Sequence, residues 1–370
     1  MIIKPGENCQ RFLSSCGSIT HLELEDSYIT IVVVVFNEIS RKKEEKMEFT
    51  KNILKLDAAK IAEEIAGFIR DQVRGFFKRK GAMIGLSGGI DSAVSGALCV
   101  KALGKERVHG LILPESDSNP VSREYGIKAA KSLGITWEEI DLTPILEKFG
   151  VYSGRTAIVK KYFPDLKGDF QFRLTLPQDL LDRDRINVYH LEVKAAEGSV
   201  RTARLSRDDY LGMMAANDIK QRTRMIQLYY AAEKRHYIVC GTTNLTEALQ
   251  GFYVKYGDGG VDIEPLASLY KTQVFQLGVH LGVPKEILDR TPSPDTYSYV
   301  VSDEELYFCL PYDTIDLILY AMDHNVSKEK VAKVLGITMD QLERAWRDIT
   351  RKREASEPIR HLPPIPSLNL

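Results

Sequence analysis

A short apolar segment runs directly into a hexapeptide of serine, glycine and aspartate, and this junction constrains the fold more than any other feature. Ala82–Leu86 has the length and composition of a buried strand, and Ser87-Gly88-Gly89-Ile90-Asp91-Ser92 follows it without a gap. A helical pattern over Ala93–Leu103 begins at once and stops at Gly104. A strand that turns this tightly into a helix predicts an α/β unit.

The alternation of strand and helix continues after this unit. Further strands are predicted over Val108–Leu113, Thr136–Asp141 and Tyr237–Cys240, and further helices over Ser122–Leu133 (closed by Gly134) and Ile219–Lys234. Strands separated by helices pair in parallel through right-handed crossovers. The predicted fold is therefore α/β with a doubly wound parallel sheet.

The chain divides into a β-rich extension, residues 1–56, and a main domain, residues 57–366, followed by a tail at 367–370. In the extension, Ser18–Leu24 and Tyr28–Phe36 are rich in β-branched residues and predict a hairpin. From Asp57, a possible N-cap, apolar residues recur every three or four positions and predict a helix that ends by Gly81.

Residues 150–210 break the alternation and are predicted to be an insertion. Arg185–Val193 and Ser199–Leu205 flank Glu197-Gly198 and predict a second small hairpin, which could pair with the N-terminal one. The proline-rich end, Leu362–Leu370, predicts an extended segment.

Composition excludes several classes of function. Across 370 residues, Lys and Arg number 50 and Asp and Glu 51, so no global field attracts nucleic acid or an anionic membrane. The five cysteines are scattered without a CxxC pair, which argues against a disulfide framework or zinc knuckle. The most apolar run, Ile29–Phe36, is too short to span a bilayer, and no signal peptide is evident. We expect a cytoplasmic protein that binds neither nucleic acid nor membrane.

The hexapeptide has the chemistry of a phosphate-binding loop. Its backbone N–H groups lie at a helix N-terminus, where the helix dipole favours a polyanion, and Gly88 and Gly89 allow a phosphate to approach the backbone. Ser87 and Ser92 add hydroxyl donors. Asp91 would repel a phosphate, and a magnesium ion that bridges carboxylate and phosphate oxygens removes this conflict. A capped strand-to-helix turn without a ligand is the alternative interpretation.

The hexapeptide resembles the signature of the N-type ATP pyrophosphatases, which split ATP to AMP and pyrophosphate. Four further segments resemble motifs of one branch, the NAD synthetases: Lys220–Met225, Gly241–Glu247, Gly251–Asp262 and Pro265–Lys271. The resemblance covers residues 57–145 and 215–366, and it implies the adenine nucleotide alpha hydrolase-like fold.

The resemblance also implies roles for individual residues. Magnesium would be held by Asp91 and Glu247, and catalysis would depend on Lys271 and Asp91. The residues implied to contact ATP are Ser87, Gly88, Gly89, Asp91, Ser92, Arg222, Thr242, Lys271 and Ser293. Those implied to contact the acceptor are Lys255, Asp258 and Asp262. Without the resemblance, Glu247 could simply cap a helix, Asp258 could belong to a turn, and Lys271 and Arg222 would be interpreted as solvated charges.

The implied reaction is amidation through an acyl adenylate. The carboxylate of nicotinic acid adenine dinucleotide would attack the α-phosphorus of ATP, and ammonia would then displace AMP to give NAD. The resemblance implies a homodimer, for which the apolar face of Ile61–Phe77 could serve unless it packs on the sheet. Residues 1–56 are too short for a glutaminase domain, so free ammonia or a separate glutaminase must supply nitrogen.

Three segments depart from the NAD synthetase pattern. Pro294–Tyr299 stands where Ala-Asp-Leu is usual, Pro358-Ile359 replaces a His-Lys pair, and residues 150–210 are longer than in typical members. All three fall on the acceptor side, so a paralogue that amidates another acid, such as a sugar acid or a secondary metabolite, is an alternative.

Three other classes of function are alternatives. A tRNA sulfur transferase would share the loop but would need reactive cysteines, whereas Cys99 and Cys240 stand in apolar contexts. A DNA-binding module is suggested by the helix-turn-helix spacing of Ser327–Leu335 and Met339–Ile349. A non-catalytic nucleotide-binding regulator would be expected to have lost a catalytic group.

Overall fold

The computed structural model describes residues 48–366, of which residues 49–366 belong to one compact unit. The predicted N-terminal hairpin and the tail at 367–370 lie outside the described residues.

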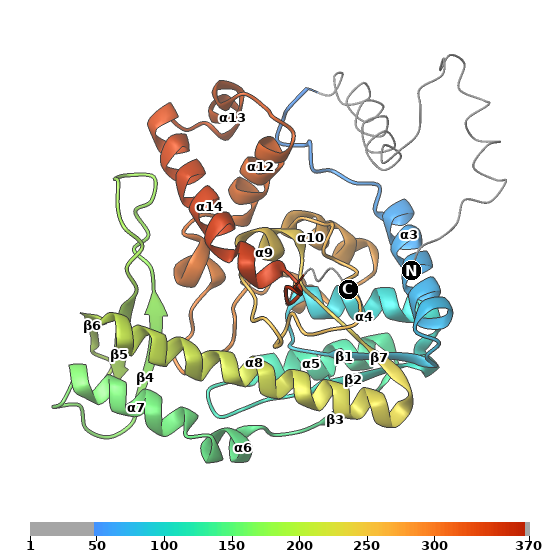
Figure 1. Ribbon diagram of the computed structural model, residues 1–370, viewed down its shortest axis with the longest axis horizontal. Coiled ribbons are helices and arrows are strands. Elements are labelled where there is room, and N and C mark those ends of the chain that lie inside the picture. The colour runs from blue at the N-terminus through green and yellow to red at the C-terminus, as the bar shows by residue number, and fades with distance from the viewer. Residues whose placement is uncertain (1–47, 367–370) are drawn as a thin grey trace. The chain divides into compact units, whose positions relative to one another are not determined.

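Strands and helices alternate along the described chain (Figure 1). The strands are β1 (Gly81–Gly85), β2 (Val108–Ile112), β3 (Thr136–Glu139), β4 (Phe170–Thr175), β5 (His190–Ala195), β6 (Val200–Arg204) and β7 (Tyr237–Cys240). The longer helices are α3 (Ala58–Arg70), α4 (Ile90–Leu103), α5 (Pro120–Leu133), α7 (Val151–Tyr162), α8 (Arg207–Arg235), α10 (Lys271–His280), α12 (Tyr312–Asp323), α13 (Lys328–Leu335) and α14 (Met339–Arg360). The shorter helices are η1 (Asp71–Phe76), η2 (Lys105–Arg107), α6 (Thr143–Lys148), α9 (Leu245–Gln250), α11 (Lys285–Leu288) and η3 (Glu304–Phe308).

The main sheet is parallel throughout, in the order β3-β2-β1-β7, as the predicted α/β fold requires. Successive residues of its strands point to opposite faces, and both faces are buried. Ala82 and Ile84 join a core on one face, whereas Met83 between them joins a core on the other. Burial on both sides explains why β1, β2 and β7 are continuous apolar runs, whereas the edge strand β3 is mostly exposed and polar.

Helices cover the two faces of the sheet. On one face α4 packs against β1 and against α3, whose Ala62, Ala66 and Ile69 are fully buried. On the other face α8 packs against β7 and β1 (Figure 1). The predicted helix after Asp57 is confirmed: the Asp57 carboxylate accepts a hydrogen bond from the Lys60 N–H. It ends in the π-helical turn η1, and Gly81 opens β1 rather than closing the helix.

Three predicted helices begin earlier than expected, and the smallest difference is at α5, which starts at Pro120 instead of Ser122. Helix α4 starts at Ile90, inside the hexapeptide, because Gly89 is already its N-cap. Helix α8 starts at Arg207 instead of Ile219, because the Ser206 hydroxyl accepts a hydrogen bond from the Asp209 N–H and caps the helix there. No described helix is both long and apolar enough to cross a membrane.

The predicted insertion contains a three-stranded antiparallel sheet, β4-β5-β6. The β5–β6 pair is the predicted hairpin around Gly198, whose φ of 92° suits its turn. Strand β4 was not predicted, and it occupies the other edge of β5. This small sheet packs with α7 and α8 around Phe172, Leu174 and Leu191.

The C-terminal helices form a separate hydrophobic core. Helices α12, α13 and α14 bury Ile318, Val331, Leu342 and Ala345 against one another. The two segments with helix-turn-helix spacing are therefore packing elements within this core, where α13 contacts α12 and α14.

Candidate active site

The carboxyl ends of β1 and β7 open onto one cavity of about 390 Å³. Chain order runs outward from β1 through β2 to β3, and then returns to place β7 on the free side of β1. The boundary between β1 and β7 is thus a topological switch point, where open α/β sheets bind their ligands. The two segments that meet there are the hexapeptide Ser87–Ser92 and the motif Gly241–Glu247.

The hexapeptide is held by its own serine hydroxyls. Ser87 Oγ lies 3.1 Å from Ser92 Oγ and accepts a hydrogen bond from the Gly89 N–H at 3.3 Å. Gly88 has a φ of 77°, and a Cβ there would lie 2.3 Å from the Ser122 carbonyl oxygen of α5. Only glycine fits this position, because any other residue would be strained and would also clash with α5.

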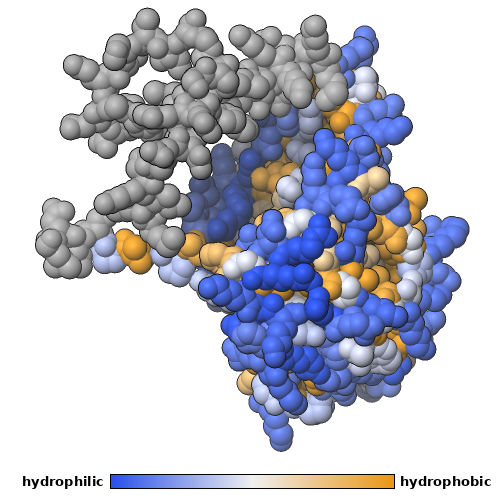
Figure 2. All heavy atoms as spheres, turned by 90° about the vertical axis from the view of Figure 1, so that its right-hand side faces the viewer, coloured by the Kyte–Doolittle hydropathy of each residue, from blue (hydrophilic) through white to orange (hydrophobic). Residues whose placement is uncertain are grey.

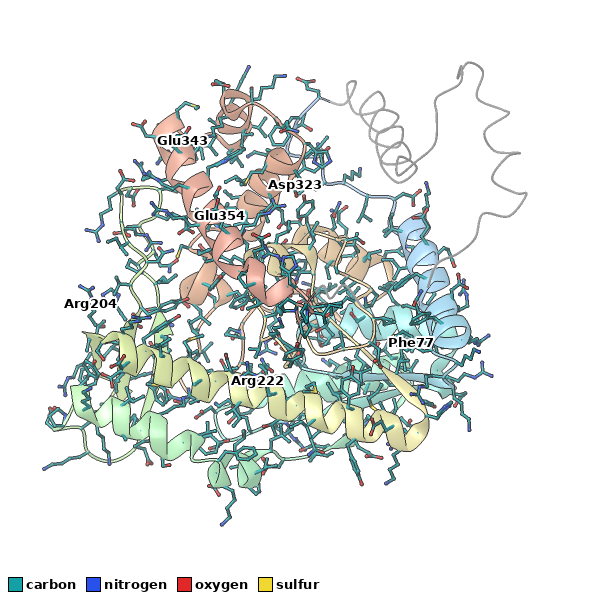
Figure 3. All side chains as sticks on the ribbon, in the orientation of Figure 1. Phe77, Arg204, Arg222, Asp323, Glu343 and Glu354 are labelled. Atoms are coloured by element: carbon teal, nitrogen blue, oxygen red, sulfur yellow. The ribbon has the colours of Figure 1, made fainter. Side chains whose placement is uncertain are left out.

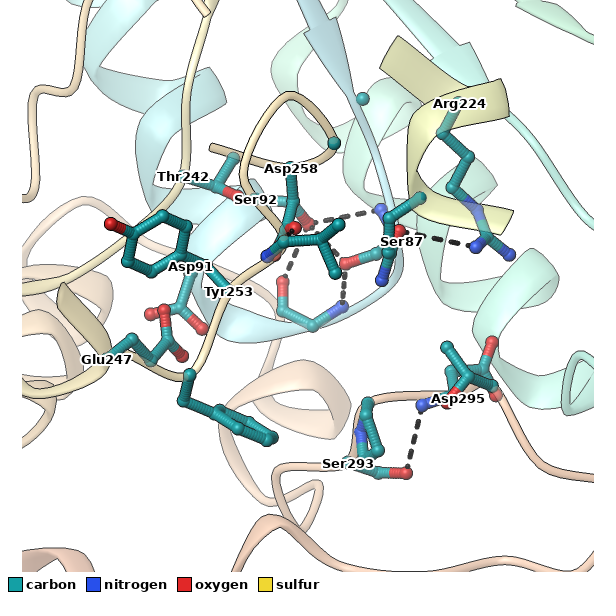
Figure 4. Close-up of a pocket in the computed structure, with 18 of the residues that line it drawn as sticks. Ser87, Asp91, Ser92, Arg224, Thr242, Glu247, Tyr253, Asp258, Ser293 and Asp295 are labelled. Atoms are coloured by element: carbon teal, nitrogen blue, oxygen red, sulfur yellow. Dashed lines mark hydrogen bonds between the residues drawn. The ribbon is translucent and has the colours of Figure 1, made fainter. Parts of the chain in front are cut away.

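Lys271, Asp91 and Glu247 form a charged cluster at the end of this loop. Lys271 Nζ donates to Asp91 Oδ2 at 2.5 Å and to Glu247 Oε1 at 3.3 Å. Its side chain is only 2% exposed, although its two partners remain open to the cavity. Figure 4 shows the two carboxylates side by side. The structure therefore brings together the three residues that the resemblance placed at the centre of the site.

Glu247 also caps helix α9, as the alternative interpretation proposed. Its second carboxylate oxygen accepts from the Asn244 N–H at 3.2 Å, and the Asn244 side chain accepts from the Glu247 N–H. The Asn244 amide also donates to Asp91 Oδ1 at 3.0 Å. Capping and cluster formation are compatible, because each uses a different oxygen of Glu247.

Burial and charge oppose one another in this cluster. Burial raises the pKa of Glu247 to about 8, although the neighbouring Lys271 acts to lower it. For Lys271, burial acts to lower the pKa, but Asp91 and Glu247 outweigh it and the pKa is raised. The ammonium is consequently held charged at neutral pH.

The donor set suits magnesium. Among the described residues no three His, Cys, Asp or Glu side chains form a preassembled metal cage. Magnesium is commonly held by one or two carboxylates together with substrate phosphates and water, and Asp91 and Glu247 offer two. Nearby, the carboxylate of Asp303 is buried and lines the cavity, and its Oδ1 has no hydrogen-bond partner among the described residues.

The other predicted site residues divide into two groups. Ser87, Gly89, Ser92, Thr242, Asp258 and Ser293 line the cavity with the central cluster, whereas Gly88, which packs against α5, is not among the lining residues. Burial raises the pKa of Asp258 to about 6, and its Oδ1 accepts from the Val254 N–H at 2.7 Å. Asp258 thus stabilises the predicted turn and also faces the cavity.

Arg222, Lys255 and Asp262 do not line the cavity. Arg222 lies on α8 (Figure 3). Its Nε donates to the Lys255 carbonyl oxygen at 3.4 Å. Lys255 Nζ donates to the His361 carbonyl oxygen at 2.8 Å. Asp262 accepts from the Tyr229 hydroxyl and from the Val239 N–H, which joins it to β7. In this structure these three residues hold other parts of the chain in place.

Several residues that line the cavity were not predicted from the sequence. Arg224, two residues after the predicted Arg222, lines the cavity and donates to the Leu113 carbonyl oxygen. Arg290 also lines it and donates to the Gly88 carbonyl oxygen and to Ser122 Oγ, which fixes the loop on α5. In the sequence, Arg290 stands just before Pro292-Ser293 and Asp303 follows it. Their position near this motif is the only feature of the sequence that could have indicated them.

The insertion and the unusual segment Pro294–Tyr299 are physically joined. The Tyr299 N–H donates to the Phe172 carbonyl oxygen of β4, and the Phe172 N–H donates to Ser298 Oγ. Pro294, Asp295, Thr296 and Tyr297 line the cavity. The insertion and the segment Pro294–Tyr299 are two of the three departures from the NAD synthetase pattern, and they are hydrogen-bonded to each other beside the cavity.

A buried ion network anchors this segment. Lys220 Nζ, fully buried, donates to Glu115 at 2.8 Å, to Asp117 at 2.7 Å and to the Thr296 carbonyl oxygen at 3.0 Å. Arg155 of α7 donates to the same Asp117 and to the same Thr296 carbonyl oxygen. The network connects the loop after β2 and helices α7 and α8 with the cavity wall.

The third departure lies elsewhere. Pro358 is inside α14, and neither it nor Ile359 lines the cavity. The adjacent Arg360 donates to the carbonyl oxygens of Ala248 and Leu249 at the end of α9. This segment supports the helix that carries Glu247.

Comparison with known proteins gives a consistent result. The NAD synthase family profile matches residues 61–166 and 177–358. The chain is 41% identical over 318 residues to the NH(3)-dependent NAD(+) synthetase of Mesorhizobium japonicum, covering 86% of this chain and 99% of that protein. It is 40% identical over 275 residues to the protein of the same name from Thermotoga maritima, covering 74% and 91%.

Solved structures share the fold. An NMN synthetase from Francisella tularensis matches with a TM-score of 0.58 at 24% identity, covering 85% of this chain and all of that one. An NH3-dependent NAD synthetase from Campylobacter jejuni matches with a TM-score of 0.55 at 22% identity, covering 84% and 100%. The fold is that of the adenine nucleotide alpha hydrolases, and the chain belongs to the NAD synthase family.

Proposed function

We propose that this protein is a carbon–nitrogen ligase that amidates nicotinic acid adenine dinucleotide to NAD, with ammonia as nitrogen source and ATP split to AMP and pyrophosphate. The observation that carries the proposal is the contact of Lys271 with both Asp91 and Glu247, at the end of the Ser87–Ser92 loop. The names of the curated relatives support the same reaction.

ATP would bind with its phosphates at the N-terminus of α4. The helix dipole and the free backbone N–H groups there favour the polyanion. Thr242, Ser293, Arg224 and Arg290 line the same cavity and add hydroxyl and guanidinium donors. In this proposal Arg224 replaces Arg222 as the arginine that contacts ATP, because Arg224 lines the cavity and Arg222 does not.

Asp91 and Glu247 would hold magnesium against the phosphates. The bound ion would neutralise charge on the pyrophosphate as it leaves. Lys271 lies between the two carboxylates, where its ammonium can stabilise the negative charge that develops at the α-phosphoryl group. The low exposure of Lys271 strengthens that interaction, because water screens it poorly.

The chemistry needs no side-chain nucleophile. An oxygen of the substrate carboxylate forms a bond to the α-phosphorus, and the bond to the bridging oxygen of pyrophosphate breaks. Ammonia then attacks the acyl carbon, loses a proton and expels AMP. The protein contributes positioning and electrostatics. In this proposal Asp258, which lines the cavity, contacts the acceptor, and Lys255 and Asp262 shape the loop around it.

We further propose a homodimer supplied with free ammonia or by a separate glutaminase. The apolar residues of α3 that are fully buried pack within the chain, so they are not available to a second copy. Phe68 and Phe76 on the same segment are 43% and 73% exposed and remain candidates for such a contact.

The proposed function is tested with purified protein, ATP, magnesium and ammonium. Pyrophosphate release and amide formation that require nicotinic acid adenine dinucleotide are expected. If pyrophosphate is released only with another acid, such as a sugar acid, the protein is a paralogue that amidates that acid. The unusual segment Pro294–Tyr299 suggests this alternative. ATP binding without pyrophosphate release, with any acid, would identify a nucleotide-binding regulator.

A further inference from the structure

A second polar cavity lies at the opposite edge of the main sheet. It is formed at the amino ends of β1, β2, β3 and β7, whereas the active-site cavity lies at their carboxyl ends. Lys80 immediately precedes β1 and Ser87 follows it closely, so the two cavities are separated by roughly 17 Å of strand. They share no lining residue. Those of the second cavity are Arg74, Arg79, Lys80, Arg107, His109, Thr136, Arg235 and Tyr237.

This cavity carries a large excess of positive charge. Five of its lining residues are arginine or lysine, and the described carboxylate paired with them is that of Glu138, which bonds Arg235. Five positive charges against one negative charge leave four uncompensated. Figure 2 looks onto the side of the molecule that includes this edge, and strongly hydrophilic side chains gather there.

The uncompensated cations have no partners of their own. Within residues 48–366, the side chains of Arg74, Arg79, Lys80 and Arg107 make no hydrogen bond or ion pair. Cations commonly offset the dipole at a helix C-terminus, and Arg235 does so by donating to the Ala231 carbonyl oxygen of α8. That explanation does not extend to Arg79 and Lys80, which stand in the loop between η1 and β1.

A buried histidine gives a second, independent observation. His109 is only 7% exposed and lines the cavity, with Nδ1 at 2.7 Å from Thr136 Oγ1. Its Nε2 has no hydrogen-bond partner among the described residues and lies 3.7 Å from a Glu138 oxygen. Burial lowers the pKa of His109, so the ring is neutral at pH 7 and one nitrogen is left to bond a ligand or a water molecule.

We propose that this cavity binds a small polyphosphate anion, such as the phosphate chain of a nucleotide, separately from the catalytic site. Clustered, unpaired cations repel one another, and a ligand with three or four negative charges relieves that repulsion where a single monoanion would not. Arginine forks suit phosphate oxygens in particular. The cations line a recess rather than an extended stripe, and the chain as a whole has a net charge of -1, which favours a compact anion over nucleic acid.

The binding test uses inorganic tripolyphosphate as the probe, by isothermal titration calorimetry of the full chain in EDTA. We expect two sites in the wild type. In the double variant Arg79→Gln/Arg107→Gln, affinity at one of them should fall by more than about tenfold, because two charge-assisted contacts are lost. The matched control is Arg207→Gln/Arg351→Gln, which removes two exposed arginines whose side chains make no hydrogen bond or ion pair within residues 48–366. This control should keep both sites.

The second site and the proposed function can each fail without the other. Binding at a single site, unchanged in Arg79→Gln/Arg107→Gln, would overturn the second site whether or not the protein makes NAD. A single-stranded oligonucleotide that binds the wild type but not this variant, without a second tripolyphosphate site, would overturn it in favour of nucleic acid. Pyrophosphate release by the variant should remain at the wild-type rate.

A second measurement avoids substitution altogether. Phenylglyoxal modifies exposed arginines, and mass spectrometry of peptides reports each position. Tripolyphosphate should protect Arg79 and Arg107 in the wild type and leave Arg207 and Arg351 reactive. Equal reactivity at all four positions, with and without tripolyphosphate, would contradict the proposal.

Discussion

Lys271 Nζ lies 2.5 Å from Asp91 Oδ2, although 180 positions of sequence separate the two residues. The contact joins the first residue of α10 to the first turn of α4, and Glu247 on α9 completes the cluster. Three helix N-termini thus present their charged residues at one edge of the sheet. This arrangement gives a single place where ATP phosphates, magnesium and a stabilising ammonium can meet.

Asp91→Asn and Glu247→Gln should each lower kcat by about 10²–10³-fold, as removal of one preorganised charge from a transition state does elsewhere. Each variant also leaves Lys271 with one fewer anionic partner. Pyrophosphate release is the measurement, and Asp208→Asn, at an exposed position of α8, is the control. Wild-type turnover in either variant would contradict the assignment of these carboxylates to magnesium.

Gly88→Ala and Gly104→Ala form a matched pair. Both glycines have positive φ, at 77° and 85°, so the strain of placing alanine there should lower the free energy of unfolding by about 1–3 kcal/mol in each variant. Among the described residues, a Cβ at Gly88 would meet the Ser122 carbonyl oxygen, whereas a Cβ at Gly104 would have no neighbour within 4 Å. Urea unfolding should show the larger loss for Gly88→Ala, and ATP binding should fail in that variant alone. Equal stability and equal ATP binding in the two variants would show that close packing of the loop on α5 contributes to neither.

Lys220→Met should destabilise the fold by about 3–5 kcal/mol, because it leaves Glu115 buried without its cation. It should also raise KM for the acceptor acid more than KM for ATP, because Lys220 holds the Thr296 carbonyl oxygen in the cavity wall. Equilibrium unfolding and steady-state kinetics measure the two effects. Lys328→Met, which breaks a surface pair with Glu343, should cost less than about 1 kcal/mol.

Glu264 should make stability depend on pH. Burial raises the pKa of Glu264 to about 8, from 4.5 in an unfolded chain, so the folded state binds the extra proton. Its contribution to stability is complete below about pH 4.5 and is lost as pH rises through 8, by about 1.4 kcal/mol per pKa unit at most. Glu264→Gln keeps an oxygen for the Thr243 N–H and should remove this loss.

Thermal unfolding at pH 5.5 and pH 8.5 tests this expectation. The advantage of Glu264→Gln over wild type should be greater at pH 8.5. Glu354→Gln, at an exposed position of α14, should give the same difference from wild type at both values. A pH-independent effect of Glu264→Gln would show that this carboxyl group is not the source.

The sequence by itself determined the local elements and the central chemistry. The apolar runs at β1, β2 and β7 predict a parallel sheet because both faces of each strand must be buried, and the structure confirms it. The hexapeptide predicts a phosphate loop because its serine hydroxyls and the backbone N–H groups at a helix N-terminus are donors for a polyanion. The resemblance then named Asp91, Glu247 and Lys271, which the structure brings together.

Only the tertiary structure decided which neighbouring residues face the cavity. Arg222 and Arg224 are equivalent in the sequence, but two positions on a helix are about 200° apart, so one faces the cavity and the other does not. Strand β4, the Lys220 network and the basic cavity around His109 depend on contacts between segments far apart in the chain. Local patterns contain no information on such contacts, because they form only when the sheet order places those segments side by side.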